Sequence, residues 1–184
     1  MNSYVLWVTD YPLASAAIQF AVLGTFGEVL SHVLRTKDWR PPCSPWQSLA
    51  KILAWALLGI VIKFGFTGMK GFVAALIDHD LLPGALTGTI GLAFAISVCT
   101  NILFGPQMMF FHRVEDNLIM GEWSWNGLRT AWFTLIWFWI PAHTITFSLP
   151  REYQIGLAAL WSVALGLIMG LAAPRRQASE RPSL

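Results

Sequence analysis

The sequence predicts an all-α integral membrane protein, and two observations lead to this fold class. Apolar residues make up 55% of the 184 residues, and charged residues make up only 12%. A soluble domain of this size carries about a quarter charged residues. The few charges lie in short segments between long apolar runs. This pattern is typical of a chain that crosses a bilayer several times.

Five apolar segments are candidates for transmembrane helices, at about 13–34, 48–78, 84–111, 128–149 and 153–173. A helix needs about 20 residues to cross the hydrocarbon core. The second segment exceeds this length, so we expect it to tilt, or to bend near Gly65, Gly68 and Gly71. We treat residues 1–173 as one transmembrane domain and expect the polar tail 174–184 to be disordered.

The alternative topology has four spans, with one of the last two segments re-entrant or merely buried. The Lys and Arg residues discriminate between the two topologies. With five spans and the N-terminus outside, nine of the 12 basic residues lie in inner loops or in the inner tail. Four spans would place the C-terminal arginines opposite the basic first loop. The positive-inside rule therefore favours five helices, with the N-terminus outside and the C-terminus inside.

The stretch IPAHTITFSLPREYQ, residues 140–154, joins the last two segments. Pro150 and the charged pair after it predict an outer turn. Pro141 falls inside the fourth segment, where it removes a backbone hydrogen bond. Such a break is tolerated in a membrane only where neighbouring groups satisfy the freed backbone. His143, Thr144 and Thr146 are near enough in sequence to do so.

Polar side chains inside the segments are candidates for a functional site, because burying them in a bilayer is costly. At a rise of about 1.5 Å per residue, Asn101, Lys63 and His143 fall about 15 to 22 Å from the inner edge, whereas Glu28 is shallower. These groups either line a path for a small solute or fix helix packing. The full set of pore or polar-cluster candidates is Glu28, His32, Lys63, Asn101, Gln107, Pro141, His143 and Thr146.

Several classes of function find no support in the sequence. It contains no HExxH, CxxC or GxSxG motif and no glycine-rich phosphate loop. We therefore expect a protein that is not an enzyme, with no catalytic residues, no metal and no cofactor. A net charge of +2 does not favour a nucleic-acid partner. The expected partners are the lipid bilayer and small polar solutes, and a second copy or another partner helix would pack on Gly65, Gly68 and Gly71.

Three motifs carry a likeness to one known family. Residues 11–34 have a proline near their start and contain Gly27-Glu28-x-x-x-His32. The stretch TNILFGP spaces Asn101 and Pro106 five residues apart, and Ile140-Pro141, Thr146-Phe147, Leu149-Pro150 and Tyr153-Gln154 follow one another in order. These motifs resemble those of the family of small membrane proteins typified by the peroxisomal membrane protein and the mitochondrial Mpv protein. That family has Gly-Asp-x-x-x-Gln, Asp-Gln-x4-Pro and a Trp-Pro signature at these places.

The resemblance implies a compact helical membrane protein that acts as a weakly selective channel for small hydrophilic solutes. The resemblance assigns no organelle: we expect the cytoplasmic membrane if the chain is prokaryotic, and the mitochondrial inner or peroxisomal membrane if it is eukaryotic. We therefore expect a channel or facilitator. The alternatives are a membrane assembly or interaction protein that transports nothing, and a substrate-binding subunit of a transporter.

Overall fold

The computed structural model describes residues 2–39 and 43–172, and within them the chain forms helices and no strand. The expected all-α class is thereby confirmed, whereas the expected disordered tail, 174–184, lies outside the described residues. The elements are α1 (Ser3–Asp10), α2 (Pro12–Thr36), α3 (Pro45–Asp78), η1 (Gly84–Leu86), α4 (Thr89–Cys99), η2 (Thr100–Phe104), α5 (Gly105–Met120), α6 (Leu128–Thr134), η3 (Leu135–Trp139), α7 (Ile140–Ser148) and α8 (Arg151–Ala172).

Three helical runs in the described part of the chain are long and apolar enough to cross a membrane: Pro12–Thr36, Pro45–Asp78 and Thr89–Met120. Large apolar side chains such as Phe64, Ile136 and Leu160 are exposed on the outside of the molecule. Soluble monomers rarely expose extensive apolar surface. Length, composition and this apolar exterior together indicate a membrane protein.

Local signals explain where the helices begin and end. Pro12 starts α2 at a position where its missing N–H costs nothing, and Lys37 ends the helix in a left-handed conformation with φ 60°. A capping box forms between Ser44 and Gln47, so α3 begins at Pro45 rather than near the expected residue 48. α3 is then one continuous helix to Asp78.

The third expected segment is longer in the structure than in the sequence prediction. Helix continues through η2 into α5 and ends only at Met120, where Gly121 adopts a φ of 72°. Residues 112–120 therefore extend this helix. No glycine or proline interrupts residues 107–120, so nothing in the sequence stops the helix earlier.

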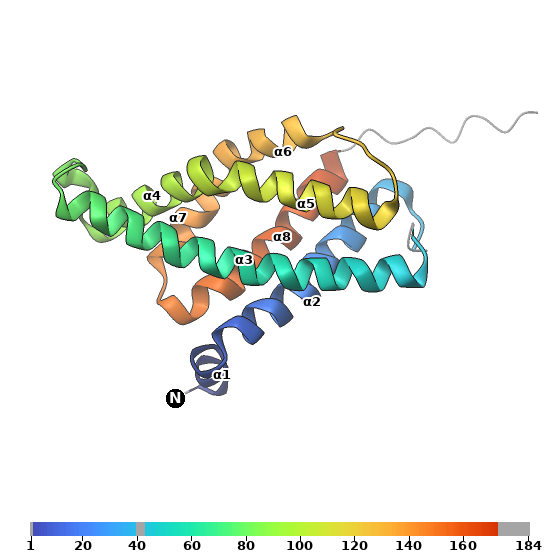
Figure 1. Ribbon diagram of the computed structural model, residues 1–184, viewed down its shortest axis with the longest axis horizontal. Helices are drawn as coiled ribbons and strands as arrows, with labels where there is room; N and C mark the ends of the chain where they lie inside the picture. Colours follow the sequence, from blue (N-terminus) through green and yellow to red (C-terminus); the bar gives the residue numbers. More distant parts are fainter. Residues whose placement is uncertain (1, 40–42, 173–184) are drawn as a thin grey trace, which may run out of the picture.

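The helices form a bundle in which α2 packs against both α3 and α8, and α4 packs against α7 (Figure 1). Small residues allow the close crossing of α2 and α8. A Cβ atom added to Gly27 would lie 2.9 Å from the carbonyl oxygen of Ser162, and Gly166 packs against the backbone of Gly27. This is the close approach of backbones that small residues permit between membrane helices.

The short helix α1 is attached to the bundle through Tyr4. Its hydroxyl donates a hydrogen bond to Oε1 of Gln19 (3.0 Å), and its ring stacks on Tyr153 with the centroids 5.9 Å apart. Burial, followed by the neighbouring Tyr153, raises the pKa of Tyr4 above its ordinary value of 10.0. Through Tyr4, α1 thus contacts both α2 and the beginning of α8.

Candidate functional site

A cavity of about 110 Å³ lies inside the bundle, and its wall is almost entirely apolar. The helices α2, α3, α5, α7 and α8 and the segments η2 and η3 all contribute to it. Its lining residues are Phe20, Trp55, Leu58, Ile62, Phe66, Thr100, Asn101, Phe104, Gly105, Met108, Met109, His112, Leu135, Trp139, His143, Ala158 and Ser162. A mainly apolar pocket with a few polar groups is the usual form of a small-molecule site.

The two segments η2 and η3 are single turns of π-helix, and both border this cavity. In η2 the N–H of Gly105 bonds to the carbonyl of Thr100, and in η3 the N–H of Ile140 bonds to the carbonyl of Leu135. A proline follows directly in each case, at positions 106 and 141. Each wide turn stands just before a residue that cannot donate a backbone hydrogen bond. π-turns are frequent at functional sites.

Asn101 and His143 meet on the cavity wall. The amide Nδ2 of Asn101 donates to the carbonyl of Ser97 (2.8 Å) and lies 3.2 Å from Nδ1 of His143. The NH2 of the Asn101 amide only donates, so Nδ1 accepts, and the neutral ring carries its proton on Nε2. The Ser97 hydroxyl donates to the carbonyl of Ile140 (2.7 Å), which links α4 to the residue before Pro141.

Three polar atoms on cavity-lining residues are buried without a hydrogen-bond partner among the described residues. They are Oγ1 of Thr100, Nδ1 of His112 and Nε1 of Trp139. The nearest acid to His112 is Glu115, at 3.9 Å, too far for a hydrogen bond. Buried polar groups in proteins are nearly always satisfied. These atoms are covered by neighbouring groups, and the open surface of the cavity is apolar. A small polar occupant would therefore reach them only after side-chain movement.

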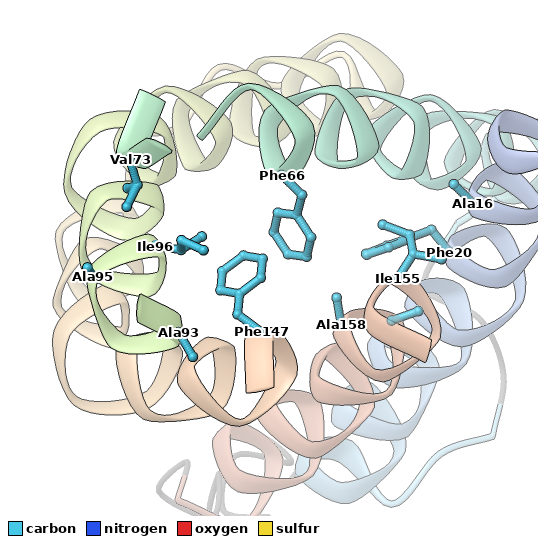
Figure 2. Close-up of a cluster of buried hydrophobic side chains, with 11 residues drawn as sticks. Ala16, Phe20, Phe66, Val73, Ala93, Ala95, Ile96, Phe147, Ile155 and Ala158 are labelled. Carbon is cyan, nitrogen blue, oxygen red and sulfur yellow. The ribbon is translucent and has the colours of Figure 1, made fainter. Parts of the chain in front are cut away.

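Aromatic rings pack tightly at one side of the cavity. The Phe66 ring contacts His143 edge-on, with centroids 5.1 Å apart, and contacts Phe147 at 4.8 Å. Figure 2 shows the rings of Phe66 and Phe147 facing each other in the core, between Ile96 on one side and Ile155 on the other. Phe66 is part of the cavity wall and is also part of the wall of a second pocket.

An ion-pair cluster lies near the other side, where Trp55 lines the cavity. Nζ of Lys51 donates to Glu28 and also to Oδ1 of Asp116 (3.1 Å). The Trp55 indole N–H donates to Oε2 of Glu28 (3.2 Å), and its ring lies 4.8 Å from that of His112. One lysine thus holds α2, α3 and α5 together through two carboxylates.

The second pocket has a volume of about 240 Å³ and lies between α3 and α8. Lys63 and Lys70 line it from α3, and Arg151 and Gln154 line it from the first turn of α8. Nζ of Lys70 donates to Oε1 of Gln154 and stands over the Phe147 ring, 5.6 Å from the centroid. The side-chain charges that line this pocket are all positive.

The structure brings together only two of the four residues expected to share a path. Asn101 and His143 are in contact, but Lys63 lines the second pocket and is absent from the cavity wall. Glu28 pairs with Lys51, and not with Lys63. The prediction that these four residues share one path rested on their depth in the membrane alone. Depth does not determine which side of a helix a residue faces.

The remaining polar candidates have separate surroundings. His32 lies near the end of α2, with Nε2 3.4 Å from the Thr36 hydroxyl. Gln107 is exposed and borders a surface depression beside Trp132. Pro141 is exposed at the second position of α7. The buried Thr146 hydroxyl donates to the carbonyl of Ala142 (2.9 Å) and accepts from the Trp161 indole (3.1 Å).

The three glycines expected to form a packing face are not equivalent. A Cβ atom at Gly65 would lie 2.5 Å from the Phe104 ring, so this glycine packs inside the molecule. Gly68 and Gly71 have nothing within 4 Å of that position and are exposed. The close crossing inside the bundle uses Gly27 and Gly166 instead.

Sequence reasoning missed Lys51, Trp55, Asp116, Ser97 and Trp139 as site residues. Lys51 had an available signal. Glu28 comes before the loop between α2 and α3, and Lys51 comes after that loop at a similar distance in sequence. In an antiparallel pair of helices, two such residues lie at the same height along the helix axes. Trp139 had no such signal, because one Trp in an aromatic-rich apolar run looks like any other.

Comparisons with known proteins leave the family question open. No protein-family model matches the chain, and neither a curated protein nor a solved structure matches it. The likeness to the Mpv and peroxisomal membrane protein family therefore stays a prediction.

Proposed function

We propose that the chain crosses the membrane five times, with its N-terminus outside and its C-terminus inside. The elements α6, η3 and α7 follow one another without a gap from Leu128 to Ser148, and α8 has 22 residues. Each run matches the length of one crossing. Gln47, at the start of α3, bonds to the carbonyl of Ile119, near the end of α5 (3.3 Å). The loops before α3 and after α5 therefore lie at one end of the bundle, and the nearby Lys37 and Arg129 agree with the positive-inside rule.

Within this topology the protein acts as a channel or facilitator for small hydrophilic solutes, and the described conformation is its closed state. The observation that carries this proposal is the cavity inside the bundle. Its apolar wall bears Asn101, His143 and the unpartnered polar atoms of Thr100 and Trp139. A cavity of about 110 Å³ holds about three or four water molecules, at about 30 Å³ each. Only solutes of a few heavy atoms would fit without further opening.

Phe66 is the best candidate for the barrier in this path. It is 4% exposed and borders both the cavity and the second pocket, so its ring separates the two spaces. Shortening this side chain would join them. On the other side of the cavity, the cluster around Lys51 joins α2, α3 and α5 beside Trp55.

The test is solute entry into vesicles that contain the purified protein, measured by light scattering after an osmotic jump with urea or glycerol. We expect Phe66→Ala to admit solute faster than the unchanged protein. Phe64→Ala is the matched control, because Phe64 is two residues away on the same helix and 60% exposed. It should leave the rate unchanged.

Folding must be checked in the same samples. Removing a buried Phe costs about 3–5 kcal/mol of stability, so Phe66→Leu serves as a milder variant that keeps an apolar side chain. Circular dichroism reports whether each variant is folded. If folded Phe66→Ala and Phe66→Leu leave the vesicles as tight as empty ones, the channel proposal is wrong.

A second candidate function is supported by the open face of α3. Gly68 and Gly71 have free space above them, and Phe64 and Phe72 beside them are exposed. Small residues of this kind accept a partner helix. A membrane interaction protein would use this face, and Gly68→Leu with Gly71→Leu would then abolish a crosslinked complex in native membranes. Solute entry unaffected by these substitutions, together with a lost complex, would favour this second function.

A further inference from the structure

The pocket between α3 and α8 has an unusual distribution of charge. Lys63, Lys70 and Arg151 line one space of about 240 Å³. Its other lining residues are Phe66, Thr67, Gln154 and Ile155, none of which is acidic. Three cations thus share a small space without an anionic group in its wall.

The charges of these three residues are also uncompensated elsewhere in the described chain. Within residues 2–39 and 43–172, the ion pairs join Lys51 to Glu28 and Asp116, and His112 to Glu115. None involves Lys63, Lys70 or Arg151. Like charges near one another, in surroundings less polar than water, repel one another substantially. Keeping three of them together is costly unless an anion joins them.

The pocket also positions its cations. Gln154 donates through Nε2 to the carbonyl of Leu149 (2.8 Å), so its Oε1 is turned toward Nζ of Lys70, which donates to it. This contact uses one of the three ammonium hydrogens of Lys70 and leaves two for a ligand. Lys70 is thus held in place by a neutral partner, which anchors it without cancelling its charge.

The start of α8 adds to the positive character of the site. Arg151, Gln154 and Ile155 belong to the first turns of this helix of 22 residues, and all three line the pocket. The N-terminus of a helix carries a partial positive charge and directs N–H groups toward an anion. The guanidinium of Arg151 supplies the paired donors that suit the oxygens of a phosphate.

From these observations we propose that the pocket formed by Lys63, Lys70, Arg151 and Gln154 binds a phosphate group. The cations neutralise the phosphate charge, and the volume leaves room beside Phe66 and Ile155 for a small apolar part of the same ligand. Basic pockets between membrane helices hold phospholipid headgroups in this way. The group belongs either to a soluble phosphate or to an anionic lipid. Binding does not depend on whether the cavity on the other side of Phe66 conducts solutes.

The experiment measures binding of two probes to the full chain purified in a neutral detergent free of phosphate. Inorganic phosphate is added in one arm and phosphatidylglycerol in the other, with phosphatidylcholine as the zwitterionic lipid control. Calorimetry gives the affinity, and the thermal unfolding temperature gives a second readout. Binding of phosphate alone assigns the site to a soluble ligand. Preference for phosphatidylglycerol over phosphatidylcholine assigns it to a lipid headgroup.

Arg151→Gln, Lys63→Gln and Lys70→Gln should each weaken binding about tenfold or more, since each removes a charge-assisted contact. Arg129→Gln is the matched control, because Arg129 contacts Phe133 and does not line the pocket. It should bind as the unchanged protein does. The ligand should raise the unfolding temperature of the unchanged chain and of Arg129→Gln, but not that of the pocket variants.

Two results would overturn the proposal. One is that neither probe binds the folded, unchanged chain. The other is that the folded pocket variants bind as tightly as Arg129→Gln, which would show that attraction to the overall basic surface accounts for any binding. Unfolding curves measured without ligand identify any pocket variant that has lost its fold. The two pocket variants that remain folded then test the proposal.

Discussion

Thr146 illustrates how a single buried hydroxyl can join two helices. The side chain is fully buried, with an exposed fraction of 0%. Its oxygen accepts a hydrogen bond from the Trp161 indole of α8, and its hydroxyl donates one to the carbonyl of Ala142. The sequence analysis named this threonine as a candidate for a pore or for a polar cluster between helices. Its contacts are those of a packing residue between α7 and α8.

We predict that Thr146→Val destabilises the protein by about 1–3 kcal/mol, because the Trp161 N–H is left without its acceptor. Thr144→Val is the matched control. Thr144 donates only to the carbonyl of Ile140 in its own helix, and that carbonyl keeps its bond from Ser97. Chemical unfolding in detergent, followed by circular dichroism, compares the two. Equal loss of stability in both variants would contradict the bridging role of Thr146.

At the scale of single elements, the two π-turns are the feature that shapes the cavity. η2 and η3 are in contact with each other, and each precedes a proline. A π-turn holds one residue more than an α-turn, so it relieves the clash that proline would make with the preceding turn. It also rotates the following residues. The register in which Asn101 faces His143 therefore depends on both turns.

We predict that Pro141→Ala allows an ordinary α-turn at η3, because the new N–H can bond to the carbonyl of Trp137. Losing one residue from the turn rotates His143 by about 100° relative to the preceding helix. Stability should fall, because the rotation removes the contact between Asn101 and His143. Solute entry through Phe66→Ala vesicles should also fall when the two substitutions are combined. Pro150→Ala, in the turn before α8, is the control. Unchanged entry in the Pro141→Ala combination would show that the π-turn does not set the cavity.

The helices themselves were largely predictable from the sequence, whereas their orientations about their own axes were not. Apolar length and punctuating residues such as Pro12, Pro45 and Gly121 determine where helices begin and end. Around a helix that faces lipid on one side and protein on the other, both sides are apolar, so the periodicity that marks the inner face is lost. For this reason the sequence predicted a depth for Lys63 close to that of Asn101, but it did not predict which side of α3 Lys63 faces.

For the molecule as a whole, the proposed topology makes a prediction about which loops face each side. His79, after α3, should lie outside, and Glu122, after α5, should lie inside, because the run from α4 to α5 crosses between them. Both residues are exposed. In a chain with Cys43→Ser and Cys99→Ala, an impermeant maleimide added to oriented vesicles should label His79→Cys from the outer side alone. Glu122→Cys should be labelled only after permeabilisation, and the reverse pattern would refute the orientation.

The cluster around Lys51 has a consequence for how the chain enters the membrane. Glu28 and Lys51 lie on α2 and α3, which are consecutive in the chain and pack against each other. A lone charge costs about 2.5–3.5 kcal/mol or more at the centre of a bilayer, and less toward its edge. Delivered together on one helical hairpin, the two charges can form a neutral pair before α5 and its Asp116 have been synthesised.

This order of assembly makes Lys51→Met a defect of biogenesis as well as of stability. We expect a smaller membrane-inserted fraction of newly made Lys51→Met chains, measured by pulse-labelling and carbonate extraction, because Glu28 then enters unpaired. Adding Glu28→Gln to Lys51→Met should restore insertion, because neither member of the ion pair is then charged. If the double variant inserts no better than Lys51→Met, the pair acts only after folding. One ion pair, formed early, thus connects the order of synthesis with the final architecture.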